Sequence, residues 1–148
     1  MKFKLKVLLF TAIFLISFNA LSDEPIPKNT SIYTSWKVYP VSDDCGGFTV
    51  TFVQKKLITK VYLQIYEGNC MSSKYPAKLI KFDKKTGTAK FSVPDQRASQ
   101  IVDAEWRFTG YIQKNKLTGR MQYCFIYTNE CTYDEKITLT KTNRETLE

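Results

Sequence analysis

The chain has 148 residues, with 22 basic against 14 acidic side chains, a formal net charge of +8 and no histidine. The lack of histidine excludes Ser-His and Cys-His nucleophile pairs and every zinc site that needs an imidazole. With no phosphate-cradling glycine loop, no paired catalytic motif and no basic helix or nucleic-acid motif, we expect a non-enzymatic protein with no cofactor and no nucleic-acid partner.

Residues 1–22 have the pattern of a cleaved signal peptide. Three lysines precede an apolar run of about 12 residues, whereas a helix that spans a bilayer needs about 20. Small residues around Ala20 and Ser22 suit a signal peptidase, so we predict cleavage before Asp23 and export to a periplasm or to the outside. A buried core helix or a retained anchor is the alternative. Cleavage removes three lysines and no acid, which leaves 19 basic against 14 acidic residues and no transmembrane span.

Residues 23–35 are polar, contain Pro25 and Pro27, and are predicted to form an N-terminal arm. From Trp36 onward the apolar positions repeat every second residue, which predicts an all-β domain over residues 36–142. Residues 143–148 are predicted to be a flexible tail. Eight strands are expected, at residues 36–41, 48–54, 57–67, 77–82, 88–93, 105–113, 117–127 and 136–141.

Most of the connections between these strands are short enough to be hairpin turns, so consecutive strands should pair antiparallel. Eight strands in meander order can close into a small up-and-down barrel, which leaves no exposed sheet edge. In strand count and order the chain resembles the calycin-type, lipocalin-like barrels. A two-sheet β-sandwich is the alternative, because periodicity alone does not separate the two.

Four cysteines remain after cleavage, an even number that predicts two disulfides in an oxidising compartment. Loop geometry favours Cys45 with Cys70 and Cys124 with Cys131, because each pair brackets a turn region between neighbouring strands. The other two pairings are alternatives, and so is a four-cysteine zinc site, although the chain has no C-x-x-C spacing.

In an up-and-down barrel the connections alternate between the two ends, which gives this chain a predicted charge polarity. One end should carry a basic tip formed by Lys55, Lys56, Lys84, Lys85, Lys114 and Lys116. The other end should carry the cysteines and an acidic mouth formed by Asp43, Asp44, Glu67, Glu130, Asp134 and Glu135. Either the mouth receives a cationic partner and the tip makes weak contact with anionic surfaces, or the charges are merely solvated turn residues.

Two glycines interrupt the bulky inward-facing rows of the sixth and seventh expected strands. They predict an interior pocket lined by Trp106, Phe108, Gly110, Gly119 and Tyr123. The alternative is that the glycines relieve crowding or allow the strands to coil.

These features favour an exported binding protein that holds an unidentified small molecule or protein at its acidic end. The alternative is an inhibitor or immunity protein that plugs a hydrolase such as a lysozyme. In outline, the chain resembles the small disulfide-braced exported barrels that serve as bacterial lysozyme inhibitors.

Overall fold

The structure is a computed structural model that describes residues 29–68, 70–95 and 103–143. The predicted leader, residues 1–22, and residues 144–148 of the predicted tail lie outside the described residues. Within the described ranges the chain forms nine strands: β1 (Thr30–Thr34), β2 (Lys37–Tyr39), β3 (Asp44–Lys55), β4 (Ile58–Glu67), β5 (Tyr75–Phe82), β6 (Thr88–Pro94), β7 (Ala104–Gln113), β8 (Lys116–Phe125) and β9 (Cys131–Thr142).

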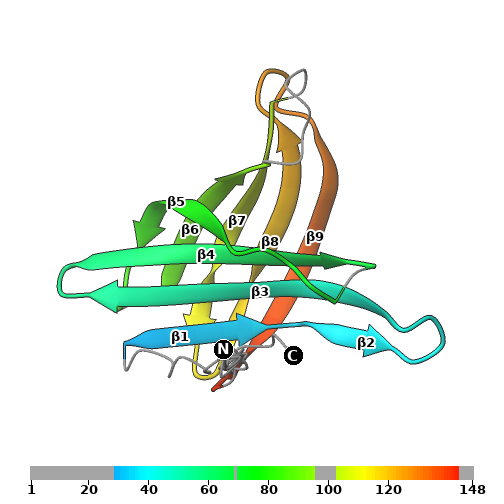
Figure 1. Ribbon diagram of the computed structural model, residues 1–148. Coiled ribbons are helices and arrows are strands. Elements are labelled where there is room, and N and C mark those ends of the chain that lie inside the picture. The colour runs from blue at the N-terminus through cyan, green and yellow to red at the C-terminus, as the bar shows by residue number, and fades with distance from the viewer. Residues whose placement is uncertain (1–28, 69, 96–102, 144–148) are drawn as a thin grey trace, which may run out of the picture.

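The strands close into an eight-stranded antiparallel barrel. From β3 to β9 each strand pairs with the next along the chain, and β1 pairs with both β3 and β9, which completes the ring. In Figure 1 strands β1 to β4 run across the view, and strands β6 to β9 rise steeply behind them. The predicted small up-and-down barrel is therefore confirmed, and the β-sandwich alternative is not adopted.

The first barrel strand begins earlier than the sequence predicts. Strands β1 and β2 pair with β3 in one continuous register, in which Thr34 faces Thr49 and Lys37 faces Gly46. Between β1 and β2 the backbone N–H of Ser35 still donates to the carbonyl oxygen of Phe48 at 2.9 Å. Residues 30–34 are thus the strand that closes the barrel, so their assignment to a polar arm is wrong.

The remaining strands match the predicted ones apart from their ends. Strand β9 begins at Cys131 rather than at residue 136, and β8 ends at Phe125. In β5 the register with β6 shifts between Leu79 and Lys81, so Ile80 is the extra residue of a β-bulge. Its side chain is 53% exposed.

Large side chains that alternate along the strands fill the interior of the barrel. The rings of Phe91 and Phe108 stack at 5.1 Å, and Phe52 meets Phe91 edge-on at 6.5 Å. Phe91, Phe108, Leu63 and Met121 are at most 1% exposed. The middle of the barrel is therefore packed with side chains, so a ligand site can form only toward an end of the barrel.

Both disulfides have the predicted pairing. Cys45 of β3 bonds to Cys70, which follows β4, and Cys124 of β8 bonds to Cys131 of β9. Each bridge ties two neighbouring strands at the end of the barrel that also carries the longer connections. Disulfides of this kind are typical of proteins that work in oxidising compartments.

Candidate functional site

A pocket of about 520 Å³ opens at the end of the barrel where the β3–β4, β5–β6 and β7–β8 turns lie. A volume of this size suits a small organic ligand. The pocket is lined from β1, β3, β4, β5 and β7 and from two of these turns. It lies at the basic end of the molecule, opposite the acidic mouth at which the sequence placed the ligand.

Aromatic rings form the apolar part of the pocket. The rings of Phe52 and Phe82 stack at 5.3 Å, and the ring of Tyr33 meets Phe52 edge-on at 6.0 Å. The side chain of Ile112 completes this apolar surface. Burial raises the pKa of the Tyr33 phenol, so Tyr33 keeps its proton at neutral pH. The apolar part of the pocket thus carries no charge.

The pocket turns polar toward its opening. Asn29, Ser31, Gln54, Thr59, Thr86 and Gln113 line it together with three lysines, Lys84, Lys85 and Lys114. Among the described residues that line the pocket there is no aspartate or glutamate. The described lining therefore combines hydrogen-bonding groups with lysines.

The β5–β6 turn that carries two of the lysines has a defined backbone. The carboxylate of Asp83 accepts hydrogen bonds from the backbone N–H groups of Lys85 at 2.8 Å and Thr86 at 3.3 Å. These bonds lower the pKa of Asp83 below its usual value. The backbone N–H of Ile112 donates to the carbonyl oxygen of Gly87 at 2.8 Å, which fastens the turn to β7.

All six lysines of the predicted basic tip are exposed. Lys84, Lys85 and Lys114 line the pocket, and Lys116 lies beside it at the start of β8. Lys55 and Lys56 form the outer part of the β3–β4 turn. The six lysines therefore lie in or beside the β3–β4, β5–β6 and β7–β8 turns.

The interior pocket predicted beside Trp106 is not formed. Gly110 and Gly119 face each other across β7 and β8, and a Cβ added to either one would lie 2.6 Å from the ring of Phe108. The ring of Phe108 thus occupies the space that the glycines leave. The prediction of a pocket is wrong at this position, and the glycines relieve crowding, as in the alternative.

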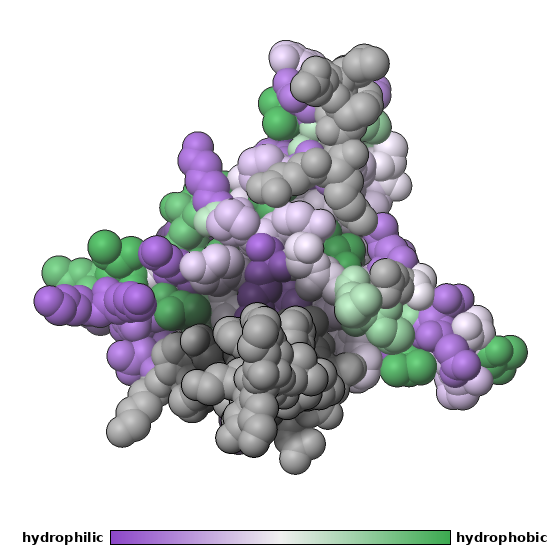
Figure 2. Space-filling model, in the orientation of Figure 1, coloured by the Kyte–Doolittle hydropathy of each residue, from purple (hydrophilic) through white to green (hydrophobic). Residues whose placement is uncertain are grey.

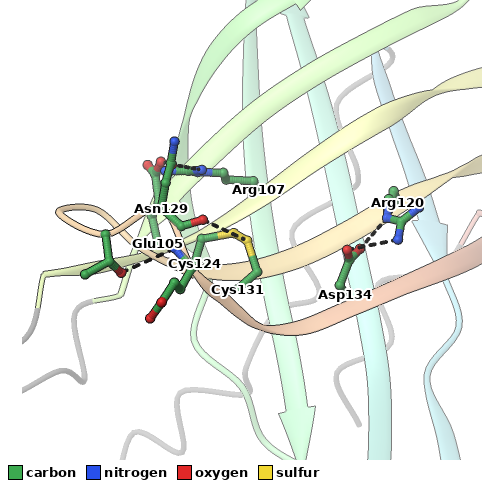
Figure 3. The surroundings of a disulfide bond; sticks show 9 residues. Glu105, Arg107, Arg120, Cys124, Asn129, Cys131 and Asp134 are labelled. Atoms are coloured by element: carbon green, nitrogen blue, oxygen red, sulfur yellow. Dashed lines mark hydrogen bonds and ion pairs between the residues drawn. A yellow bond between two sulfur atoms is a disulfide. The ribbon is translucent and has the colours of Figure 1, made fainter.

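The predicted acidic mouth divides between two regions. Asp43 and Asp44 lie at the β2–β3 turn and Glu130 lies in the β8–β9 turn, and Figure 1 shows these turns apart from each other. Asp134 is not in the mouth, because the Arg120 guanidinium of β8 pairs with its carboxylate across the sheet (Figure 3). The hydrogen bond from Arg120 lowers the pKa of Asp134.

The remaining two acids of the mouth, Glu67 and Glu135, lie near the aromatic ring of Tyr133. The Tyr133 hydroxyl donates to Oε2 of Glu135 at 3.1 Å, and the Tyr133 ring lies 5.4 Å from that of Trp106. Burial, this hydrogen bond and the negative charges of Glu135 and Glu67 together raise the pKa of Tyr133 to about 12. Tyr133 thus links an acid of the mouth to the ring of Trp106.

The arginines near the second disulfide reduce the negative charge of this end. Arg107 pairs with Glu105 at 2.7 Å and donates to the amide oxygen of Asn129 in the β8–β9 turn, also at 2.7 Å. Figure 3 shows these side chains around the bridge between Cys124 and Cys131. The turn is therefore held by a covalent bond and by a polar contact from β7.

Comparison with protein-family models, with curated proteins and with solved structures finds no match to this chain. The described residues contain no group of three or more cysteine or acidic side chains placed to hold a metal ion. Within the same ranges no helical segment has the length and hydropathy that a membrane crossing requires.

The predicted site residues do not include the uncharged polar residues that line the pocket, although the sequence contains a signal for them. The inward-facing series of β3 runs through Phe48, Val50 and Phe52 and ends at Gln54. The series of β4 starts at Thr59 before it becomes apolar. Because paired strands turn polar at the same end, the interior itself must be polar there.

Proposed function

We propose that the protein is an exported, non-enzymatic binding protein whose ligand enters the pocket at the basic end of the barrel. The observation that carries this proposal is the pocket of about 520 Å³, with an aromatic base and lysines at its opening. The two disulfides support an oxidising compartment. The predicted leader supports export.

The lining defines the chemistry of the ligand. A planar or aliphatic part of the ligand packs against Phe52, Phe82 and Ile112, where contact with apolar surface contributes most of the affinity. An anionic group then lies among Lys84, Lys85 and Lys114, which meet no acid in the lining. The ligand class is therefore a small amphiphilic anion, such as a carboxylate or sulfonate with an apolar body.

Two dyes with the same ring system test this proposal. 8-Anilinonaphthalene-1-sulfonate carries an anionic sulfonate, whereas N-phenyl-1-naphthylamine has the same ring system without the charge. We expect the oxidised protein without residues 1–22 to bind the sulfonate at least tenfold more tightly, with one equivalent bound in fluorescence titrations. The triple variant K84Q/K85Q/K114Q should lose this preference and still bind the neutral dye.

A matched control separates the pocket from net charge. The variant K37Q/K74Q/K136Q removes three lysines elsewhere on the described surface and should leave the preference for the sulfonate unchanged. The variant Gln54→Trp, which fills the pocket, should weaken both dyes. Equal affinity for the two dyes, or an equal loss in both triple variants, would contradict the proposal.

A second function is favoured by exposed side chains at the opposite end. Val41 is 101% exposed, Met71 79% and Tyr127 84%, and each lies in a connection next to a disulfide. Exposed apolar groups beside a disulfide suit a protein partner, because the cross-link limits the conformational entropy that is lost on binding. The second proposed function is therefore the inhibition of a basic hydrolase by this end of the barrel.

Lysozyme, a basic hydrolase, provides the test of this second function. We expect the protein to slow the clearing of a bacterial cell-wall suspension by lysozyme. The charge reversal D43K/D44K/E135K should abolish the effect. Full lysozyme activity at a hundredfold molar excess of the protein would exclude lysozyme as the target.

A further inference from the structure

The β3–β4 turn exposes two aliphatic side chains at the basic end of the barrel. Lys55 pairs with Ile58, so Lys56 and Leu57 form the two-residue tip of the hairpin. Leu57 is 100% exposed and Ile58 is 65% exposed. Figure 2 shows hydrophobic and hydrophilic residues side by side over this turn, at the left of the molecule. Because these side chains project from a hairpin tip, they bury little surface against the barrel core and contribute little to the stability of the fold.

Lysines flank this aliphatic tip and also occupy the neighbouring turns. Lys55 and Lys56 precede it, Lys60 follows it, and all three are exposed. The β5–β6 and β7–β8 turns carry four more exposed lysines at the same end: Lys84, Lys85, Lys114 and Lys116. Lys56 has a φ of 53°, a left-handed conformation that is uncommon for a residue other than glycine.

We infer that this end of the barrel docks on an anionic membrane surface, with Leu57 and Ile58 inserted at the level of the headgroups and the acyl-chain boundary. An aliphatic tip flanked by lysines matches the layers of such a surface, since the lysines reach the phosphates while the apolar tip enters below them. A protein partner for two projecting aliphatic side chains would need a matching apolar groove, and nothing about the tip requires one.

This docking does not depend on the proposed ligand, although it would turn the pocket opening toward the membrane. The pocket and the tip share one end of the barrel, and the tip extends past the Gln54 and Thr59 positions that line the pocket. A small amphiphilic anion then has only a short distance to pass between the membrane and the pocket. Docking and ligand binding can therefore be tested separately.

Sedimentation with vesicles tests the docking. We expect the oxidised protein without residues 1–22 to bind vesicles of phosphatidylcholine with 30% phosphatidylglycerol at least tenfold more tightly than vesicles of phosphatidylcholine alone. Raising the salt from 0.1 to 0.5 M should weaken the binding, because surface charges are then screened over a shorter distance. The variants L57S/I58S and K55Q/K56Q should each lose at least fivefold in affinity.

The far end of the barrel supplies the matched control. The variant V41S/M71S removes two side chains of similar exposure, 101% and 79%, and should bind the anionic vesicles normally. Insertion is measured directly with Leu57→Trp, whose fluorescence should be quenched by lipids brominated near the headgroup. The same lipids should not quench Val41→Trp.

Three results would overturn the inference: no binding to anionic vesicles, equal binding to neutral ones, or unchanged binding of L57S/I58S. The last result would mean that charge alone holds the protein at the surface. Gln54→Trp, which fills the pocket, should still bind the vesicles. If Gln54→Trp binds the vesicles and also binds both dyes as tightly as the parent does, the proposed ligand function fails while the docking holds.

Discussion

Gly110 and Gly119 lie directly opposite each other on β7 and β8, under the ring of Phe108. A Cβ at Gly110 would lie 2.3 Å from the carbonyl oxygen of Thr118, and one at Gly119 would lie 2.5 Å from that of Thr109. These neighbours are backbone atoms and cannot move aside as a flexible side chain would. The two positions therefore accept only glycine without a shift of the strands.

We expect Gly110→Ala to lower the free energy of unfolding by about 2 to 3 kcal/mol, as overpacking of a filled core does. The nearby exposed substitution Thr109→Ala should change it by less than about 0.5 kcal/mol. Urea denaturation monitored by circular dichroism measures both. A Gly110→Ala variant as stable as the parent would mean that Phe108 does not pack over the glycines.

Asp83 gives a pH-dependent contribution to stability at the β5–β6 turn. Its pKa is lower in the folded protein than in the unfolded chain, because two backbone N–H groups donate to the carboxylate. Its contribution is therefore present above the unfolded pKa and is lost as the pH falls through the lower folded pKa.

We accordingly expect Asp83→Asn to melt at a lower temperature than the parent at pH 7 and at the same temperature near pH 2. Thermal unfolding at several pH values, with the exposed Asp103→Asn as a comparison, measures this difference. A gap in melting temperature that persists at pH 2 would show that the turn depends on the shape of the side chain rather than on its charge.

Strand β1 is the strand that the sequence pattern does not predict, and the burial of its side chains explains why. Ile32 and Tyr33 are neighbours in sequence and point to opposite faces, yet they are only 2% and 4% exposed. A short strand that is buried on both faces shows no alternation between apolar and polar residues. The longer strands β7 and β8 each have a more exposed face, and for this reason their period was readable.

Contacts between residues far apart in the sequence also limit how much of the candidate site can be predicted. The positions of the turns followed from the meander, so the basic tip could be predicted from turn residues alone. The packing of Phe108 over Gly110 depends on the register of β7 with β8, which the sequence does not display. The pairing of Arg120 with Asp134 depends on the register of β8 with β9 in the same way. Local patterns thus defined the ends of the barrel, whereas register determined that Phe108 fills the space beside the glycines and that Arg120 reaches Asp134.

We expect the chain without residues 1–35 to lose its closed barrel. Without β1, the edges of β3 and β9 lose their partner and can pair with other molecules. Light scattering after gel filtration should show association, whereas the chain beginning at Asp23 should be monomeric. A monomer with cooperative unfolding after the larger truncation would mean that β9 can close directly on β3.

At the scale of the whole molecule, the barrel separates covalent bracing from the candidate binding site. Cys45 lies nine residues before Gln54 on β3, a separation of about 30 Å along an extended strand. Both disulfides join strands at the end opposite the pocket, and none of the cysteines lines it. The core between the two ends is filled by Phe91, Phe108 and their neighbours. The bridges should therefore govern stability without shaping the site.

The variant in which all four cysteines are replaced by alanine tests this separation. By the chain-entropy estimate, loss of the Cys45–Cys70 bridge should cost about 3.5 kcal/mol and loss of the shorter Cys124–Cys131 bridge about 2.5 kcal/mol. At a temperature where the variant is still folded, we expect its affinity for 8-anilinonaphthalene-1-sulfonate to stay within twofold of the parent. Calorimetry gives the stability and fluorescence titration gives the affinity. A large loss of affinity in the folded variant would mean that strain passes along β3 from the bridge to the pocket, so that the two ends of the barrel act as one unit.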